Sequence, residues 1–247
     1  YLPGDGMADI HWRVTAKRGR LVTKEYQLER TQEIYVLLDA SRLSSRHVKP
    51  ASIRHDGGRE HLLDSYITAG LNLGDFAQRQ GDRFGLIAFS DRVLSFIRAG
   101  RGRGHFHVCR DTLFDLHPRT VTPDFDELAA LIMQNLRRRA LLVFLTSLGD
   151  PSLAESFLSA MEAVSRRHLV LVGMIRPPQA VPLFSDPDVS DVADIYKRLG
   201  GHLALQNLRE LEIALRRRAI QFFLVDHGKL CVEMVSHYMD VKRRQIL

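Results

Sequence analysis

The chain has 247 residues, of which 45% are hydrophobic, and its formal net charge at pH 7 is +6. This length and composition support a complete hydrophobic core, so we expect a globular protein with one large domain or two small ones. No apolar run approaches the roughly 18 to 20 residues that cross a bilayer, which excludes a membrane-spanning segment within this sequence.

Residues 1–30 differ in character from the rest of the chain. They start at Tyr1 in the turn-rich stretch YLPGDG, without an initiator methionine or a secretory segment. We therefore expect that a preceding segment has been removed and that any membrane anchor went with it. The alternating stretch GRLVTKEYQLE predicts an extended arm and a strand. This divides the chain into an N-terminal arm, residues 1–30, that packs on a main domain, residues 31–247.

The main domain alternates between apolar runs and segments with helical spacing of apolar residues. A short piece, residues 91–100, follows the second run so closely that it predicts an antiparallel edge strand. Most of the runs are continuously apolar, which is typical of strands that are buried on both faces. The pattern predicts an α/β fold with an open, mostly parallel sheet and helices on both sides. The expected strands are 33–39, 84–90, 140–146, 168–175 and 220–225, and the expected helices cover 62–76, 125–136, 153–164 and 231–241.

Acidic residues follow the predicted strands at their carboxyl ends, where open α/β sheets bind ligands. Asp39 ends the first strand and Asp150 follows the strand at 140–146, while Asp124 and Asp126 open a helix. Carboxylates at a helix start also cap free N–H groups, and for Asp124 and Asp126 we favour this capping role. The sequence predicts an acidic rim at this edge of the sheet.

Basic runs lie at the ends of the predicted helices, where cations complement the helix dipole. Three of these runs immediately precede a strand, so they should gather at the edge opposite the acidic rim. A basic edge of this kind suits anionic lipid or an acidic protein. Nucleic acid is disfavoured because no aromatic residues interleave with the runs. The runs are RRR at 137–139, RRH at 166–168, RRR at 216–218 and KRR at 242–244.

The remaining motifs do not indicate a phosphate-binding, metal-binding or catalytic site. The stretch RGRGHFH, residues 101–107, lacks the Lys-Ser/Thr ending of a phosphate-binding loop, and we expect a surface turn. Cys109 and Cys231 stand outside any CxxC pattern or regular histidine spacing, so they form neither a disulfide framework nor a zinc site and suit a reducing cytoplasm. No GxSxG nucleophile elbow is present in the sequence.

Several stretches together resemble one bacterial family over essentially the whole chain. YLPGD, IHWR and AKRGRLVTKEYQLER precede an apolar strand that ends in Asp39, and GDRFGLIAFSDRV follows at 81–93. RRRALLVFLTSLGD, RRHLVLVGMIRPP and the closing HYMDVKRRQIL continue the likeness in order. In these motifs the chain resembles the family catalogued as domain of unknown function 58.

The resemblance implies a von Willebrand factor A-like fold with a metal-ion-dependent adhesion site at the top edge of the sheet. Members of the family accompany MoxR-type AAA+ ATPases and are thought to act as adaptors or assembly factors. Many longer members carry membrane-spanning helices ahead of the Y-x-P-G-D motif. For this chain the resemblance implies the cytoplasmic domain of a membrane-anchored bacterial protein with an ATPase partner.

The adhesion-site pattern is D-x-S-x-S after the first strand, a threonine from a second loop and an aspartate after the fourth strand. Asp39 and Ser41 match this pattern, and Thr122 supplies the threonine. The third position is Leu43, and the expected aspartate is replaced by Ser147. Oxygen ligands of this kind suit Mg²⁺, but the set lacks one of its two carboxylates, so we expect no tightly bound metal. The implied partner-binding rim comprises Asp39, Ser41, Asp124, Ser147 and Asp150.

Three functions follow, in order of preference. The first is a non-catalytic adaptor that has a degenerate adhesion site and binds a protein partner through its rim or arm. The second is an adhesion-type domain in which Asp39, Ser41 and Thr122 still hold Mg²⁺ weakly. The third is a metal-assisted hydrolase that uses the rim acids, which the sequence disfavours because no histidine or lysine base accompanies them.

Overall fold

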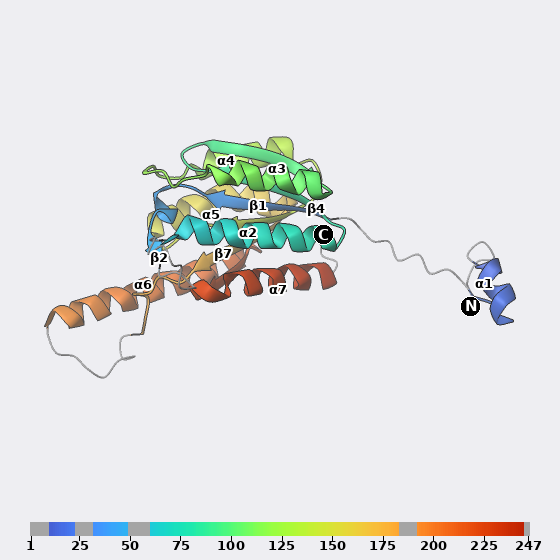
Figure 1. The fold of residues 1–247 in the computed structure, drawn as a ribbon. Coiled ribbons are helices and arrows are strands. Elements are labelled where there is room, and N and C mark those ends of the chain that lie inside the picture. Colours follow the sequence, from blue (N-terminus) through green and yellow to red (C-terminus); the bar gives the residue numbers. More distant parts are fainter. Residues whose placement is uncertain (1–9, 23–31, 49–59, 183–191, 245–247) are drawn as a thin grey trace, which may run out of the picture. The chain divides into compact units, whose positions relative to one another are not determined.

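The computed structural model describes residues 10–22, 32–48, 60–182 and 192–244 (Figure 1). The chain divides into two compact units, residues 1–31 and 32–247. In the first unit Trp12–Arg18 forms helix α1, which ends at Gly19 in the left-handed conformation with φ of 63°. The sequence predicted an extended arm here. The helix signals that this prediction overlooked are a glycine just past the end and basic residues in the last turn.

The strand expected in the arm falls mainly on residues 23–31, which lie outside the described residues. The packing of the arm on the main domain therefore stays a prediction.

The second unit is built on a six-stranded sheet in the order β5-β4-β1-β6-β7-β8. All neighbouring strands are parallel except β5, which runs antiparallel to β4. At the centre, Leu37 of β1 pairs with Ile87 of β4 and with Phe144 of β6. The predicted strands and the antiparallel edge strand are confirmed, with boundaries that differ by a residue or two. Their bounds are β1 Glu33–Asp39, β4 Arg83–Phe89, β5 Val93–Gly100, β6 Leu141–Leu145, β7 Leu169–Ile175 and β8 Gln221–Val225.

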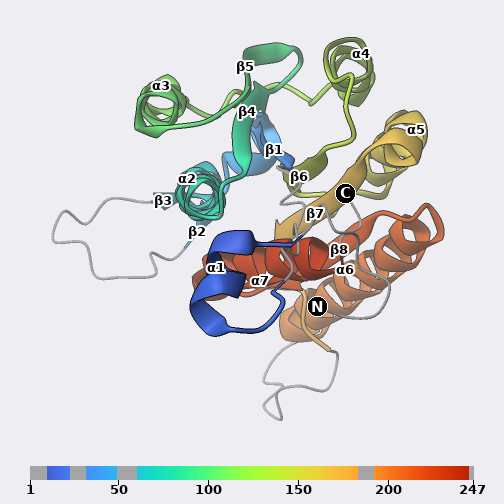
Figure 2. The same cartoon turned by 90° about the vertical axis from the view of Figure 1, so that its right-hand side faces the viewer.

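Helices cover both faces of this sheet (Figure 2). Alternate side chains of a strand point to opposite faces, so Tyr35 and Leu37 pack on one side and Val36 and Leu38 on the other. One face is covered by α4 Phe125–Asn135, α5 Pro151–Arg167 and α6 Val192–Arg217, and the other by α2 Leu62–Arg79, α3 Arg103–Phe114 and α7 Leu230–Arg243. Short elements complete the unit: the 3-10 turns η2 Arg42–Ser44 and η3 His227–Lys229, and the strand pair β2 His47–Val48 and β3 Glu60–His61.

Helix α3 lies where the sequence predicted a surface turn, so that prediction was wrong. Two contacts of the helix explain its position. The Nε2 of His105 donates a hydrogen bond to the carbonyl oxygen of Phe84 at 2.7 Å, and Cys109 is fully buried in the core. His107 is exposed two positions along the helix, so the two histidines do not form a pair of metal ligands.

A buried carboxylate fastens the last helix to the start of β4. Asp82 is 2% exposed, and its Oδ1 accepts a hydrogen bond from the backbone N–H of Gln32 at 3.1 Å. Its Oδ2 accepts from the Tyr238 hydroxyl and, at 3.0 Å, from the Lys242 ammonium, both on α7. Burial raises the pKa of Tyr238, and the contact with Asp82 raises it further. Asp82 therefore connects the starts of β1 and β4 to the C-terminal helix α7.

The histidine of the basic run 166–168 makes the stability of the protein depend on pH. His168 is 2% exposed, and neither ring nitrogen has a hydrogen-bond partner in the described part of the chain. Burial, with added repulsion from Arg167 and Arg139, lowers the pKa of His168 to about 4. The unfolded chain takes up this proton near pH 6.5, whereas the native chain stays neutral down to the lower pKa. Stability is therefore fully present above that range and falls as the pH drops through it.

We expect the chain to lose on the order of 2 kcal/mol of unfolding free energy through His168 between pH 7 and pH 4.5. Urea unfolding at both pH values measures this loss. The variant His168→Leu has no group to titrate at this position, so its stability should fall by that much less over the same interval. Equal losses in the two proteins would show that His168 does not titrate as its burial implies.

Candidate functional site at the carboxyl edge of the sheet

The strand order reverses direction beside β1, and this reversal creates the site. From β1 the chain passes to β4 on one side and later to β6 on the other. The loops that leave the carboxyl ends of β1 and β6 therefore diverge, which leaves a crevice where α/β sheets bind ligands. Asp39 ends β1, and Thr146 and Ser147 follow β6 directly, so the structure brings the predicted site residues Asp39 and Ser147 to the same edge.

Asp39 lies beneath the surface rather than on it. Its side chain is fully buried, with Oδ1 accepting a hydrogen bond from the backbone N–H of Ser41 at 2.8 Å. Its Oδ2 accepts from the Thr146 hydroxyl at 2.5 Å. Burial raises the pKa of Asp39, and these hydrogen bonds partly oppose that rise. Asp39 thus braces the turn after β1 against the loop after β6, whereas the sequence prediction treated it as part of the exposed rim.

The other predicted metal ligands also hydrogen-bond to groups of the protein. Ser41 is fully buried, and its hydroxyl accepts from the backbone N–H of Leu43 at 3.3 Å, where it caps η2. The exposed Thr122 accepts from the Nε of Arg42 at 3.4 Å. Ser147, the buried rim residue that replaces the expected aspartate, accepts from the Nη2 of Arg46, also at 3.4 Å.

These residues do not fit a magnesium site. Both oxygens of Asp39 already accept hydrogen bonds, and it is the single carboxylate among the matched ligands. The hydroxyls of Thr122 and Ser147 each face a guanidinium, whose positive charge would repel a dication. Among the described residues, no group of three or more histidine, cysteine or acidic side chains is arranged to hold a metal ion.

The exposed acids of the predicted rim are helix caps. The Oδ1 of Asp124 accepts hydrogen bonds from the backbone N–H groups of Asp126 and Glu127, both at 3.0 Å, at the start of α4. The Oδ1 of Asp150 accepts from the N–H of Ser152 at 2.9 Å at the start of α5. The capping role favoured from the sequence for Asp124 is confirmed, while Asp126 lies exposed in the first turn of α4.

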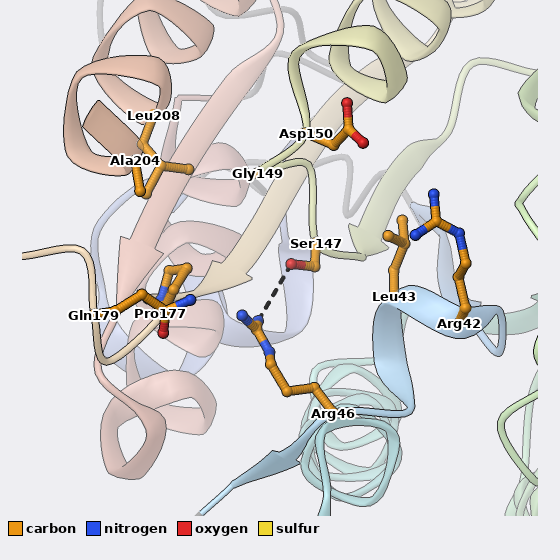
Figure 3. Close-up of a pocket in the computed structure, with 10 residues that line it drawn as sticks. All are labelled: Arg42, Leu43, Arg46, Ser147, Gly149, Asp150, Pro177, Gln179, Ala204 and Leu208. Carbon is orange, nitrogen blue, oxygen red and sulfur yellow. Dashed lines mark hydrogen bonds between the residues drawn. The ribbon is translucent and has the colours of Figure 1, made fainter. Parts of the chain in front are cut away.

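A pocket of about 280 Å³ opens beside these residues (Figure 3). Arg42, the first residue of η2, and Arg46, just after it, form one side, and the loop after β6 forms the back. The loop after β7 and helix α6 form the opposite side. The lining residues are Arg42, Leu43, Arg46, Ser147, Gly149, Asp150, Pro177, Gln179, Ala204 and Leu208.

The wall opposite the arginines depends on a close contact between the loop after β7 and α6. A Cβ atom at Gly201 would lie 2.1 Å from the carbonyl oxygen of Gln179, so only glycine lets the two segments approach this far. The pocket residue Ala204 lies on the same helix, one turn further along. The shape of the pocket is therefore built into the packing of the fold.

Sequence reasoning missed the two arginines of the pocket. Both were visible in the sequence, because Arg42 stands inside the stretch that matches the adhesion-site pattern and Arg46 follows shortly after it. Their role depends on the direction in which η2 turns the chain, which the pattern alone does not give.

Comparisons with known proteins match most of the chain. The sequence profile of the family described as "Protein of unknown function DUF58" matches residues 1–194. The uncharacterized proteins Rv1480 of Mycobacterium tuberculosis and Mb1516 of Mycobacterium bovis are each 24% identical to the chain over 194 residues. That match covers 78% of this chain and 56% of each relative, so the chain spans about half the length of these curated relatives.

Solved structures share the fold at low sequence identity. The conserved hypothetical protein BatB from Bacteroides thetaiotaomicron is 12% identical with a TM-score of 0.53, over 86% of this chain and 99% of that one. An aerotolerance-related membrane protein from Bacteroides fragilis is 14% identical with a TM-score of 0.51 and the same coverage. The PilB minor pilin from Streptococcus sanguinis is 11% identical with a TM-score of 0.55, over 91% of this chain and 63% of that one.

The fold is von Willebrand factor A-like, as the sequence resemblance predicted. Within the described part of the chain, no helix combines the length and the apolar character that a bilayer crossing requires.

Proposed function

The chain belongs to the DUF58 family of proteins of unknown function, and on this premise we propose that it is a non-catalytic protein–protein interaction module with a degenerate metal-ion-dependent adhesion site. The pocket at the carboxyl edge of the sheet carries the proposal. It opens at the position where this fold class binds its ligands, and it combines charged and apolar lining residues. A mixed lining of this kind suits side chains of another protein.

The composition of the pocket argues against the hydrolase alternative. Its lining, as far as the structure describes the chain, includes no histidine, lysine or cysteine that would act as a base or nucleophile. Its one carboxylate, Asp150, caps α5. A metal-assisted reaction is disfavoured as well, because the predicted ligand set does not fit a dication.

The partner that we propose is a MoxR-type AAA+ ATPase, with which the module acts in the assembly or maturation of other proteins. The family resemblance supports this partner. We also propose that the module is the cytoplasmic domain of a membrane-anchored bacterial protein. The likeness to a solved structure described as an aerotolerance-related membrane protein supports the membrane-anchored part of this proposal. The basic runs that precede β6, β7 and β8 would then meet anionic lipid or an acidic protein.

Site-specific photocrosslinking in extracts of the bacterium that encodes the full-length protein tests this function. A photoreactive residue replaces Gln179 or Asp124 at the carboxyl edge, or Arg138 or Arg217 at the opposite edge, and all four side chains are exposed. We expect a discrete product of the same mass from both positions at the carboxyl edge. We also expect equal yields with EDTA and with millimolar Mg²⁺, since the module needs no metal.

Mass spectrometry of the product identifies the partner. Products from Arg138 and Arg217 alone would place binding at the wrong edge and overturn the proposed role of the pocket. A product that forms with Mg²⁺ and disappears with EDTA would favour the metal-dependent alternative.

A further inference from the structure

The pocket holds two arginines whose hydrogen-bonding capacity is mostly unused. Among the described residues, each guanidinium makes one hydrogen bond of 3.4 Å to a hydroxyl, which is long for an N–H donor, and a guanidinium has several donors in a planar fork. Within the described residues, neither Arg42 nor Arg46 has a carboxylate within ion-pair distance. Some arginines on helix surfaces do have one, as in Arg166 with Glu162.

The acids at this edge of the sheet do not neutralise the pair. Asp39 is buried below the pocket and bonded to Ser41 and Thr146. Asp150 lines the pocket, but its carboxylate caps α5 and points away from Arg46 (Figure 3). The two guanidiniums therefore give this side of the pocket a net positive charge.

The rest of the lining indicates which anion fits. Apolar surface lines the pocket beside and opposite the arginines, and it comes from Leu43, Pro177, Ala204 and Leu208. A planar carboxylate matches the guanidinium fork with two parallel hydrogen bonds. Phosphate fits less well, because the Ser152 N–H at the start of α5, which could otherwise bind it, is already capped by Asp150.

We propose that Arg42 and Arg46 bind the acidic side chain of a partner protein directly, with an apolar neighbour of that acid seated against the apolar wall. This inference rests on the proposed interaction function and names the chemistry of the partner. The guanidiniums take the role that a bound cation would have at an intact adhesion site. Binding is therefore independent of divalent metal, and it weakens as the salt concentration rises.

Titration with short peptides, followed by NMR of the arginine Nε–H groups, tests the proposal. The probe is N-acetyl-Leu-Glu-amide, and N-acetyl-Leu-Gln-amide differs from it in the carboxylate alone. We expect the Glu probe to shift the Arg42 and Arg46 signals in a saturable way, with a dissociation constant in the millimolar range. The Gln probe should bind at least tenfold more weakly. Inorganic phosphate should leave both signals in place.

Four variants locate the interaction. Arg46→Gln and Arg42→Gln should each weaken binding of the Glu probe about tenfold, which is the effect of losing one charge-assisted contact. Arg166→Gln removes the same charge at the far end of α5 and should bind like the unaltered chain. The variant Arg46→Lys keeps the charge without the fork and should bind with intermediate affinity. Backbone spectra that match the unaltered chain show that each variant is folded.

Four results would overturn the proposal. The first is that the Arg42 and Arg46 signals do not shift at tens of millimolar Glu probe, and the second is that the Gln probe binds as tightly as the Glu probe. The third is that phosphate shifts both signals, and the fourth is that Arg166→Gln weakens binding as much as the pocket variants do. Failure of the proposal about the arginine pair can be told apart from failure of the proposed interaction function. Crosslinks from Gln179 that persist when both pocket arginines are replaced by glutamine would keep the interaction module and reject the arginine pair.

Discussion

Replacing Asp39 with alanine lowers the free energy of unfolding by about 3 kcal/mol, whereas asparagine leaves it unchanged or raises it. Alanine leaves the Ser41 N–H and the Thr146 hydroxyl buried without an acceptor. Asparagine keeps an oxygen for the Ser41 N–H, and the Thr146 hydroxyl can rotate to accept a hydrogen bond from the new amide. Asparagine also removes a carboxylate whose ionised form is disfavoured by burial.

Urea unfolding of both Asp39 variants at pH 7 checks this expectation. Because the pKa of Asp39 is raised in the native state, its favourable contribution is complete below about pH 4 and is lost as the pH rises through the native pKa. The unaltered chain should therefore lose more stability than Asp39→Asn as the pH rises. Asp150→Asn, a change at an exposed cap, serves as the control and should cost less than about 1 kcal/mol. Equal damage from asparagine and alanine would show that the negative charge itself is needed, as it would be in a metal ligand.

Replacing Asp82 with alanine lowers the free energy of unfolding by about 3 to 4 kcal/mol. The change removes the common acceptor of the Gln32 N–H, the Tyr238 hydroxyl and the Lys242 ammonium. Breaking a buried charged pair from one side is costly because the remaining charge loses its partner while still partly shielded from water. The effect is large because three separate elements lose their connection at once.

A double-mutant cycle with Tyr238→Phe measures how much of this effect belongs to α7. Tyr238→Phe alone should cost about 1 to 2 kcal/mol, and in the Asp82→Ala background it should cost less, because its acceptor is already gone. Additive losses would show that the two residues act independently. A loss below about 1 kcal/mol for Asp82→Ala would contradict the role of the carboxylate as the anchor of the C-terminal helix.

The sheet could be predicted from the sequence because its strands are continuous apolar runs of strand length, and both faces are buried. Helix α3 could not be predicted in this way. Gly102 and Gly104 suggest a turn, and the helix forms because His105 and Cys109 find partners in the core. Helix α1 was not predicted, because the alternating pattern of residues 19–29 indicated a strand more strongly than Gly19 indicated the end of a helix.

The candidate site could be predicted only in part. Strand ends placed Asp39 and Ser147 at one edge, since parallel strands all end on the same side. The burial of Asp39 and the position of Arg46 beside Ser147 depend on how η2 turns, which no spacing rule gives. Asp82 was missed because an aspartate between a helix and a strand looks like an ordinary turn residue. Its partners on α7 lie as far as 160 residues away in the sequence.

The connection between Asp82 and α7 has a consequence for how the protein is made. The hydrogen bond between Asp82 and Tyr238 spans 156 residues of the sequence. In the centre of the sheet, β1 pairs on one side with β6, which is synthesised about a hundred residues after it. Contacts at such separations form late, because the loop between them must close first. Until α7 leaves the ribosome, the part of the sheet face that α7 covers and the carboxylate of Asp82 stay uncovered. Exposed apolar surface of this kind promotes aggregation, so we expect the growing chain to benefit from chaperones.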